Sequence, residues 1–340
     1  MVYFTIYDYW WFYLGFVAFV AFVLSLDLGV FHKQAHVVSV GEAAIWTSIW
    51  VSCALVFNVL FYYYAVYVLS ERASLMQLPG FDPELTAKNL AMEFTTGFLI
   101  EKALAIDNIF IFAVVFSYFG IPRLYQHRVL FWGIFGALIF RGIFIAIGAE
   151  LMKIQAAVIF FGILLFATGI RIIITREKEP DLSQNFFLRQ MNRLFRIEHE
   201  IKGDHFFITK DKKIYLTPLF VALIFIELSD ILFAIDSVPA IFAITNEPLI
   251  VFTSNVFAIL GLRSMYFFLS GAIDKFKYIK FGLAGVLMFV GLKMTFLNDL
   301  YKGHFPIWLS LLIIVLILTT SILASIFLDK KPISSTKVLR

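Results

Sequence analysis

Long apolar runs separated by short polar segments make up most of this sequence. We count nine runs of about 18 or more mainly apolar residues, the length that an α-helix needs to cross the hydrocarbon core of a bilayer. They lie at residues 9–31, 43–69, 93–119, 129–151, 154–175, 216–245, 250–271, 279–297 and 306–328. The pattern predicts an all-α polytopic membrane protein with about nine transmembrane helices.

Composition supports this fold class. Of the 340 residues, 61% are hydrophobic and 15% charged, and the mean hydropathy is +0.88, which is too apolar for a soluble globular protein. The net charge of +4 indicates no nucleic-acid partner, because the basic residues are placed by the membrane. The single cysteine, Cys53, cannot form an intrachain disulfide, and we interpret it as a small buried apolar residue rather than a redox thiol.

Lysine and arginine are unevenly distributed between the two sides of the membrane. If the polar loop at 176–215 is cytoplasmic, most of the basic residues outside the spans fall in cytoplasmic segments, as the positive-inside rule predicts. An odd number of spans then places the N-terminus outside and the C-terminus in the cytoplasm.

Two of the apolar runs carry related acidic motifs. Residues 225–240 read FIELSDILFAIDSVPA, and residues 99–110 read LIEKALAIDNIF. In both, an acid precedes the aspartate of an Ala-Ile-Asp triplet by six residues, Asp230 before Asp236 and Glu101 before Asp107. Each motif opens a group of three spans, so the two groups enter the membrane from opposite sides, which predicts a core of two inverted three-helix repeats.

The predicted organisation has five parts. They are an N-terminal two-helix addition at 1–92, a first repeat at 93–175, a cytoplasmic loop at 176–215, a second repeat at 216–297, and a last helix with a cytoplasmic tail at 298–340.

The predicted spans contain more acids than bases. The acids are Asp27, Glu101, Asp107, Glu227, Asp230 and Asp236, and the bases are Lys102, Arg141, Arg263 and Lys293. A charge at the bilayer centre costs about 3 kcal/mol, so we expect the acids to be paired with these counter-charges, protonated, or bound to a cation. Structural salt bridges that lock helices together are the alternative. Asp27 lies near the end of its span and is either a second-site ligand or an interfacial residue.

Helix geometry predicts a break in the second acidic span. At 100° per residue, Glu227 and Asp230 lie about 60° apart, whereas Asp236 falls on the face opposite Glu227. Since Pro239 removes a helical hydrogen bond, we expect a kink or break near Ile235 to Pro239 that would bring the acids together. Oxygen ligands of this kind, with Asn108 and Ser237, suit manganese, magnesium or calcium.

These motifs resemble those of the TerC family of integral membrane proteins and, within it, the Alx-like subgroup. The matching stretches are IEKALAIDN at 100–108, ELSD at 227–230, FAIDSVPAIFA at 233–243, and TSNVFAILGLR with MYF between 253 and 267. The resemblance implies a bacterial inner-membrane protein associated with manganese export, the response to alkaline pH and tellurium resistance. It also implies a set of metal ligands: Glu101, Asp107, Asn108, Glu227, Asp230 and Asp236.

We therefore expect an inverted-repeat transporter that moves manganese(II) out of the cytoplasm by alternating access. No motif of a hydrolase or nucleotide-driven enzyme is present, so we expect neither an enzyme nor a covalently bound cofactor. The alternative is a non-transporting accessory protein that serves metal loading, insertion of exported proteins, or a tellurium or pH stress response. The expected partners are a divalent metal ion and the lipid bilayer, with a homo-oligomer or another membrane protein left open.

Overall fold

The computed structural model describes residues 2–26, 38–174, 196–198, 201, 203–210, 213–269, 278–301 and 305–328. Almost all of these residues are helical, which confirms the polytopic all-α prediction. The described strands form one antiparallel hairpin, β1 (Phe207–Lys210) with β2 (Lys213–Leu216), in which Phe207 lies opposite Leu216. The hairpin lies at the end of the predicted 176–215 loop, where the sequence analysis expected no strand.

The long helices follow the apolar runs closely. They are α1 (Ile6–Leu26), α2 (Val40–Glu71), α4 (Pro83–Tyr118), α5 (Arg123–Leu151), α6 (Gln155–Ile174), α8 (Pro218–Phe242) and α13 (Ile307–Leu328). The helices α9 (Pro248–Leu260) and α10 (Leu262–Leu269) meet at a bend of 41°. The helix α11 (Ile279–Leu292) continues through a π-helical segment, η4 (Lys293–Leu297), into α12 (Asn298–Leu300), and α3 (Ala73–Met76) is a short connection.

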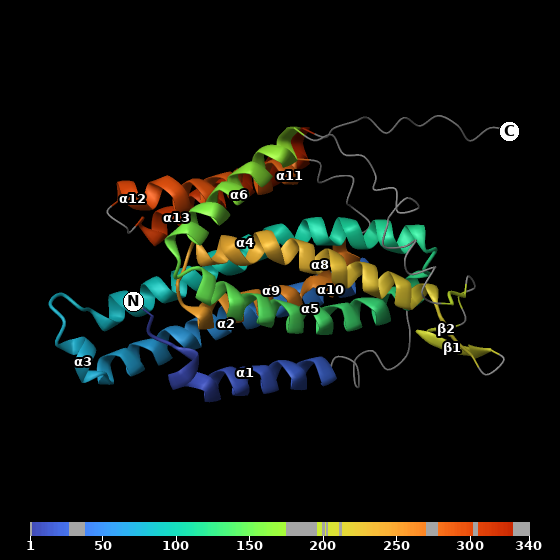
Figure 1. Cartoon of the computed structure of the whole chain (residues 1–340), viewed down its shortest axis with the longest axis horizontal. Helices are drawn as coiled ribbons and strands as arrows, with labels where there is room; N and C mark the ends of the chain where they lie inside the picture. Colours follow the sequence, from blue (N-terminus) through green and yellow to red (C-terminus); the bar gives the residue numbers. More distant parts are fainter. Residues whose placement is uncertain are drawn as a thin grey trace.

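Seven of the described helices are long and apolar enough to cross a membrane, or eight if α9 and α10 form one span. The helix α4, which covers the predicted span at 93–119, is not among them, and its middle carries Glu101, Lys102 and Asp107. It nevertheless runs through the centre of the bundle, packed against α2, α8 and α9 (Figure 1). The total of nine spans therefore stays a prediction.

Helices of the first predicted repeat pack against helices of the second. The helix α4 contacts α8 and α9, while α8 contacts α4 and α5, and α6 packs along α11 (Figure 1). Two related halves would produce this arrangement, although the inverted repeat itself stays a prediction. The α6–α11 contact depends on glycine, because a Cβ at Gly291 would lie 2.5 Å from the carbonyl oxygen of Gly162.

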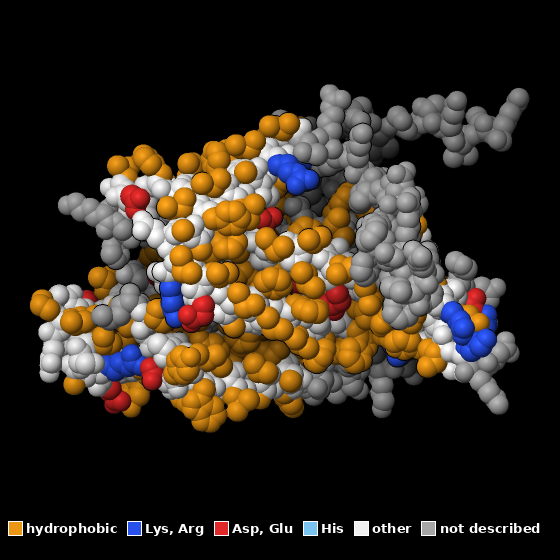
Figure 2. Space-filling model, in the orientation of Figure 1, with side chains coloured by type: hydrophobic (Ala, Val, Ile, Leu, Met, Phe, Trp, Pro, Cys, Tyr) orange, Lys and Arg blue, Asp and Glu red, His pale blue; other side chains and the backbone are white. Residues whose placement is uncertain are grey.

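The outer surface of the bundle is apolar. Hydrophobic side chains dominate the face seen in Figure 2, and many large ones, such as Leu60 and Phe160, are more than half exposed. A surface of this kind is stable against lipid hydrocarbon and would be an aggregation hazard in water. The structure therefore agrees with a protein embedded in a bilayer.

The predicted break at Pro239 is wrong. The helix α8 continues without interruption through Pro239, which lies one turn before the helix ends at Phe242. Pro239 has no N–H to donate to the carbonyl of Ile235, and α8 keeps its helical course despite this missing hydrogen bond. A bend occurs instead at Gly261, where α9 ends and α10 begins.

Candidate cation site in the membrane

Arg141 of α5 is the centre of a buried network of ion pairs. Its Nε and Nη2 atoms donate to the carboxylate of Asp230 on α8 at 3.0 and 2.7 Å, and its Nη1 donates to Glu101 on α4. Asn255 of α9 accepts from Nη1 at 3.1 Å and donates to Glu101 at 3.4 Å. Arg141, Glu101 and Asp230 are each at most 3% exposed. One planar guanidinium therefore joins four helices through charge-assisted hydrogen bonds.

A cavity of about 300 Å³ adjoins this network. Glu101 and Asn108 reach it from the first acidic motif, and Asp236 and Ser237 reach it from the second. Arg141 lies in its wall, and Arg171, in the last turn of α6, extends it toward the end of the bundle that precedes the 176–215 loop. The two acidic motifs, 129 residues apart in the sequence, thus converge on one space.

Two buried oxygen atoms beside this cavity have no hydrogen-bond partner among the described residues. They are Oδ1 of Asn108 and Oγ of Ser237, and these residues are only 2% and 1% exposed. They occupy the same position in the two motifs, directly after Asp107 and Asp236. An unsatisfied buried oxygen costs about 1 to 3 kcal/mol, and an ion or ordered water is its usual explanation. The pair is therefore a ready source of neutral oxygen ligands.

Two of the other predicted ligands, Asp107 and Asp27, have no described side chain. Asp107 lies on α4, but its side chain is outside the described part of the structure, and Asp27 is outside the described residues altogether. Glu227 lies on α8 apart from the cavity, with its carboxylate packed against Gly136 of α5, where any Cβ would collide with it. Its Oε2 atom is also buried without a described partner.

The four basic residues predicted as counter-charges lie in different parts of the structure. Arg141 alone of the four bonds to described acids of the two motifs. Lys102 donates to the carbonyl of Ala258 at 2.9 Å, beside the bend at Gly261. Arg263 contacts His127 at 3.1 Å, and Lys293 is buried in η4, where its charge interacts with that of Glu93.

Within the described residues, no three His, Cys, Asp or Glu side chains are grouped as they would be around a metal ion. The geometry explains this for Glu101 and Asp230, because the guanidinium of Arg141 lies between them and takes their oxygen atoms. In this conformation a cation from the protein itself therefore offsets part of the negative charge of Glu101 and Asp230.

The sequence analysis missed a second buried polar cluster. It lies where the chain passes from the C-terminal end of α8 to the start of α9. Glu247, the residue before α9, is 2% exposed and accepts the backbone N–H groups of Tyr3 and Phe4. Thr245 accepts from the backbone N–H of Glu247 at 3.1 Å and donates to Glu93 at 2.5 Å. Burial raises the pKa of Glu247, and the two backbone hydrogen bonds oppose this shift. The Glu-Pro pair before an apolar run, a helix-start signal, could have revealed the residue.

Comparison with known proteins agrees with these motifs. Residues 86–332 match the family described as integral membrane protein TerC family. The membrane protein STKORF319 of Myxococcus xanthus is 46% identical over 313 residues, covering 92% of this chain and 91% of the relative. The Alx protein of Escherichia coli K12, whose name proposes a membrane-bound redox modulator, is 40% identical over 299 residues, covering 87% of this chain and 88% of the relative. No solved structure gives a significant match. The chain belongs to the TerC family of integral membrane proteins.

Proposed function

We propose that this protein transports a divalent cation, manganese(II) in the first instance, out of the cytoplasm through the cavity beside Arg141. The proposal places it in a bacterial inner membrane with the N-terminus outside and the C-terminus in the cytoplasm. The observation that carries it is a pair of buried oxygens, Asn108 Oδ1 and Ser237 Oγ, that have no hydrogen-bond partner in the described part of the chain and lie at matching positions of the two acidic motifs.

The ligand chemistry suits a hard or borderline divalent ion. Asp236 adds a carboxylate to these two neutral oxygens, and Glu101 lies in the same cavity wall. Carboxylate, amide and hydroxyl oxygens are the ligands that manganese, magnesium and calcium prefer, and thiolate or imidazole ligands for softer ions are absent from the described lining. The preference for manganese within this class rests on the family resemblance.

Arg141 supplies a reason why the site can exist without its cargo. A buried carboxylate left without a cation is strongly destabilising, and here Arg141 pairs with both Glu101 and Asp230. When the cargo enters, it replaces the guanidinium at one or both acids, so that one cation is exchanged for another. The cavity reaches Arg171 in the last turn of α6, which on the predicted topology is the cytoplasmic end, so entry would occur from that side.

Metal flux in proteoliposomes tests the proposal. We expect manganese flux in the wild type, its loss in Asp236→Asn, and a clear reduction in Ser237→Ala. Ser229→Ala is the matched control, because Ser229 lies on the same helix but bonds to the carbonyl of Phe225 and does not line the cavity. Wild-type flux in Asp236→Asn would refute the site. Absence of flux for manganese, magnesium, calcium, zinc and iron in folded wild-type protein would favour the accessory-protein alternative.

A further inference from the structure

Lys102 of α4 brings a positive charge into the bundle without an acidic partner in the described part of the chain. The acids of the two motifs that lie nearby are paired with Arg141 instead. The ammonium of Lys102 donates to a backbone oxygen, the carbonyl of Ala258 on α9, at 2.9 Å. It also lies 5.6 Å from the centroid of the Phe98 ring, which is a cation–π contact. A charge within a membrane span is costly, so its position calls for a physical reason.

The carbonyl that Lys102 binds belongs to the C-terminal end of an interrupted helix. Ala258 lies in the last turn of α9, and α10 begins directly after Gly261 at an angle of 41°. The last carbonyls of a helix lack intrahelical N–H partners, and the peptide dipoles give this end a partial negative charge. In transporters whose helices are interrupted within the membrane, such C-terminal ends coordinate sodium ions or protons. The end of α9 is therefore a backbone element that attracts a cation.

Glycine at the bend makes room for the ammonium. A Cβ at Gly261 would lie 2.7 Å from Nζ of Lys102 and 3.2 Å from Cβ of Trp50 on α2. Any other residue would therefore crowd the ammonium or the indole. The φ of Gly261 is −84°, which every residue type can adopt. The close approach of the charged group, and not the backbone conformation, therefore favours glycine at this position.

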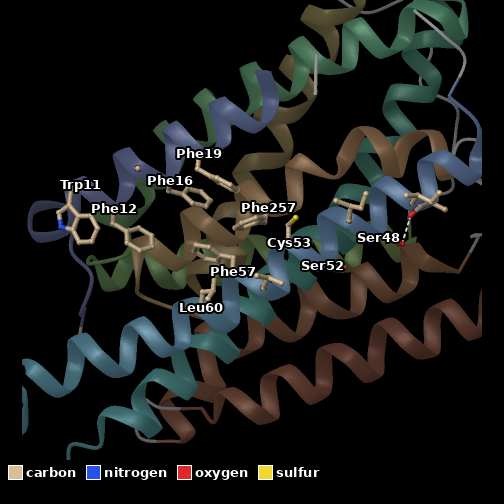
Figure 3. A pocket seen from close by; sticks show the side chains of 15 residues that line it. Trp11, Phe12, Phe16, Phe19, Ser48, Ser52, Cys53, Phe57, Leu60 and Phe257 are labelled. Atoms are coloured by element: carbon tan, nitrogen blue, oxygen red, sulfur yellow. Dashed lines mark hydrogen bonds between the residues drawn. The ribbon is translucent and has the colours of Figure 1, made fainter. Parts of the chain in front are cut away.

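Apolar rings pack against the last turn of α9 from α1 and α2. The centroid of the Phe257 ring lies 5.5 Å from that of Phe16 and 5.0 Å from that of Phe57 (Figure 3). None of these rings can donate a hydrogen bond, so the cation for this helix end comes from α4. There it follows directly after Glu101, whose carboxylate accepts from Asn255 of the same α9 at 3.4 Å. The ammonium thus joins α9 to α4 beside the candidate site.

We propose that the C-terminal end of α9 is a binding site for a monovalent cation, and that Lys102 occupies it with a tethered ammonium. The tethered charge stabilises the bend between α9 and α10, so the protein requires no free sodium or potassium there. The inference does not depend on the cargo, because Lys102 is not part of the described lining of the cavity beside Arg141.

Removing the ammonium tests this proposal, because it should leave a site that small free cations can enter. The measurement is thermal unfolding of the full-length protein in detergent, in four chloride salts at equal ionic strength: sodium, potassium, methylammonium and tetramethylammonium. Lys102→Ala should melt below the wild type in tetramethylammonium, whose cation is too large for the space of one ammonium. At least one of the smaller cations should raise its melting temperature saturably, by about 5 °C at about 100 times the dissociation constant. The wild type should melt alike in all four salts.

Lys153→Ala is the matched control, because it removes an exposed ammonium, paired with Glu150 at 2.7 Å, and should respond to the salts as the wild type does. Lys102→Met fills the space without a charge and should also show no response. If Lys102→Ala does not fold in tetramethylammonium, the yield of monodisperse protein in the four salts replaces the melting temperature, and rescue by a small cation supports the proposal. Equal melting temperatures or yields of Lys102→Ala in all four salts would show an ordinary helix cap only and overturn it. A response of the wild type or Lys102→Met as large as that of Lys102→Ala would overturn it too.

Discussion

Replacing Arg141 by glutamine is the sharpest test of the network at the candidate site. The change removes the donors that reach Asp230 at 2.7 and 3.0 Å and the donor to Glu101, and it leaves both acids buried. Glutamine can replace at most one or two of these hydrogen bonds and none of the charge. Arg171→Gln is the matched control, because Arg171 lines the same cavity but is exposed.

The expected magnitude follows from the burial of the pair. Removing one partner of a buried ion pair costs about 3 to 5 kcal/mol, because the remaining charge stays uncompensated. At about 2 °C per kcal/mol for a large domain, the melting temperature should fall by about 6 to 10 °C. An exposed substitution such as Arg171→Gln should change stability by less than about 0.5 kcal/mol.

Thermal unfolding of the purified protein in detergent, followed by tryptophan fluorescence, measures these changes. Adding Glu101→Gln and Asp230→Asn to Arg141→Gln should restore most of the lost stability, because the uncompensated charges are removed together with their partner. Manganese should raise the melting temperature of Arg141→Gln more than that of the wild type, since the ion no longer competes with the guanidinium. A loss below about 1 kcal/mol in Arg141→Gln, or a triple variant as unstable as the single one, would refute the reasoning.

Three further predictions concern other parts of the fold. Ser237→Ala should leave the free energy of unfolding unchanged or raise it by up to about 1 to 3 kcal/mol while lowering metal flux, because it removes a buried oxygen that has no partner among the described residues. A large loss of stability would show that the hydroxyl is bonded. Gly291→Ala should destabilise the α6–α11 contact by about 1 to 3 kcal/mol, measured against Gly41→Ala, where a Cβ meets open space. Since burial raises the pKa of Glu247, the folded protein binds a proton there more tightly than the unfolded chain. The stability that this proton contributes is complete at low pH and is lost as the pH rises through the raised pKa. Unfolding curves over pH should show this slope in the wild type and lose it in Glu247→Gln, and equal slopes in both would contradict the assignment.

The sequence determined the fold class and the helices that carry the acidic residues. Runs of about 20 apolar residues can satisfy their backbone in lipid only as helices, so the ends of α8 and α13 fall within three residues of the runs at 216–245 and 306–328. An ionisable residue inside such a run is costly wherever the helix packs. The acids of α4 and α8 could therefore be singled out without any knowledge of their neighbours.

Tertiary structure decided which of these groups meet. Sequence spacing gives the relative angle of two side chains on one helix, but not the rotation and depth of that helix against α5 or α9. Only the packing shows that Arg141 joins Glu101 to Asp230 while Lys102 turns to the carbonyl of Ala258. The same packing brings Asn108 and Ser237 to one cavity and leaves Glu227 against Gly136. Contacts between distant segments depend on the relative placement of whole helices, and the local patterns that predict each helix do not contain that information.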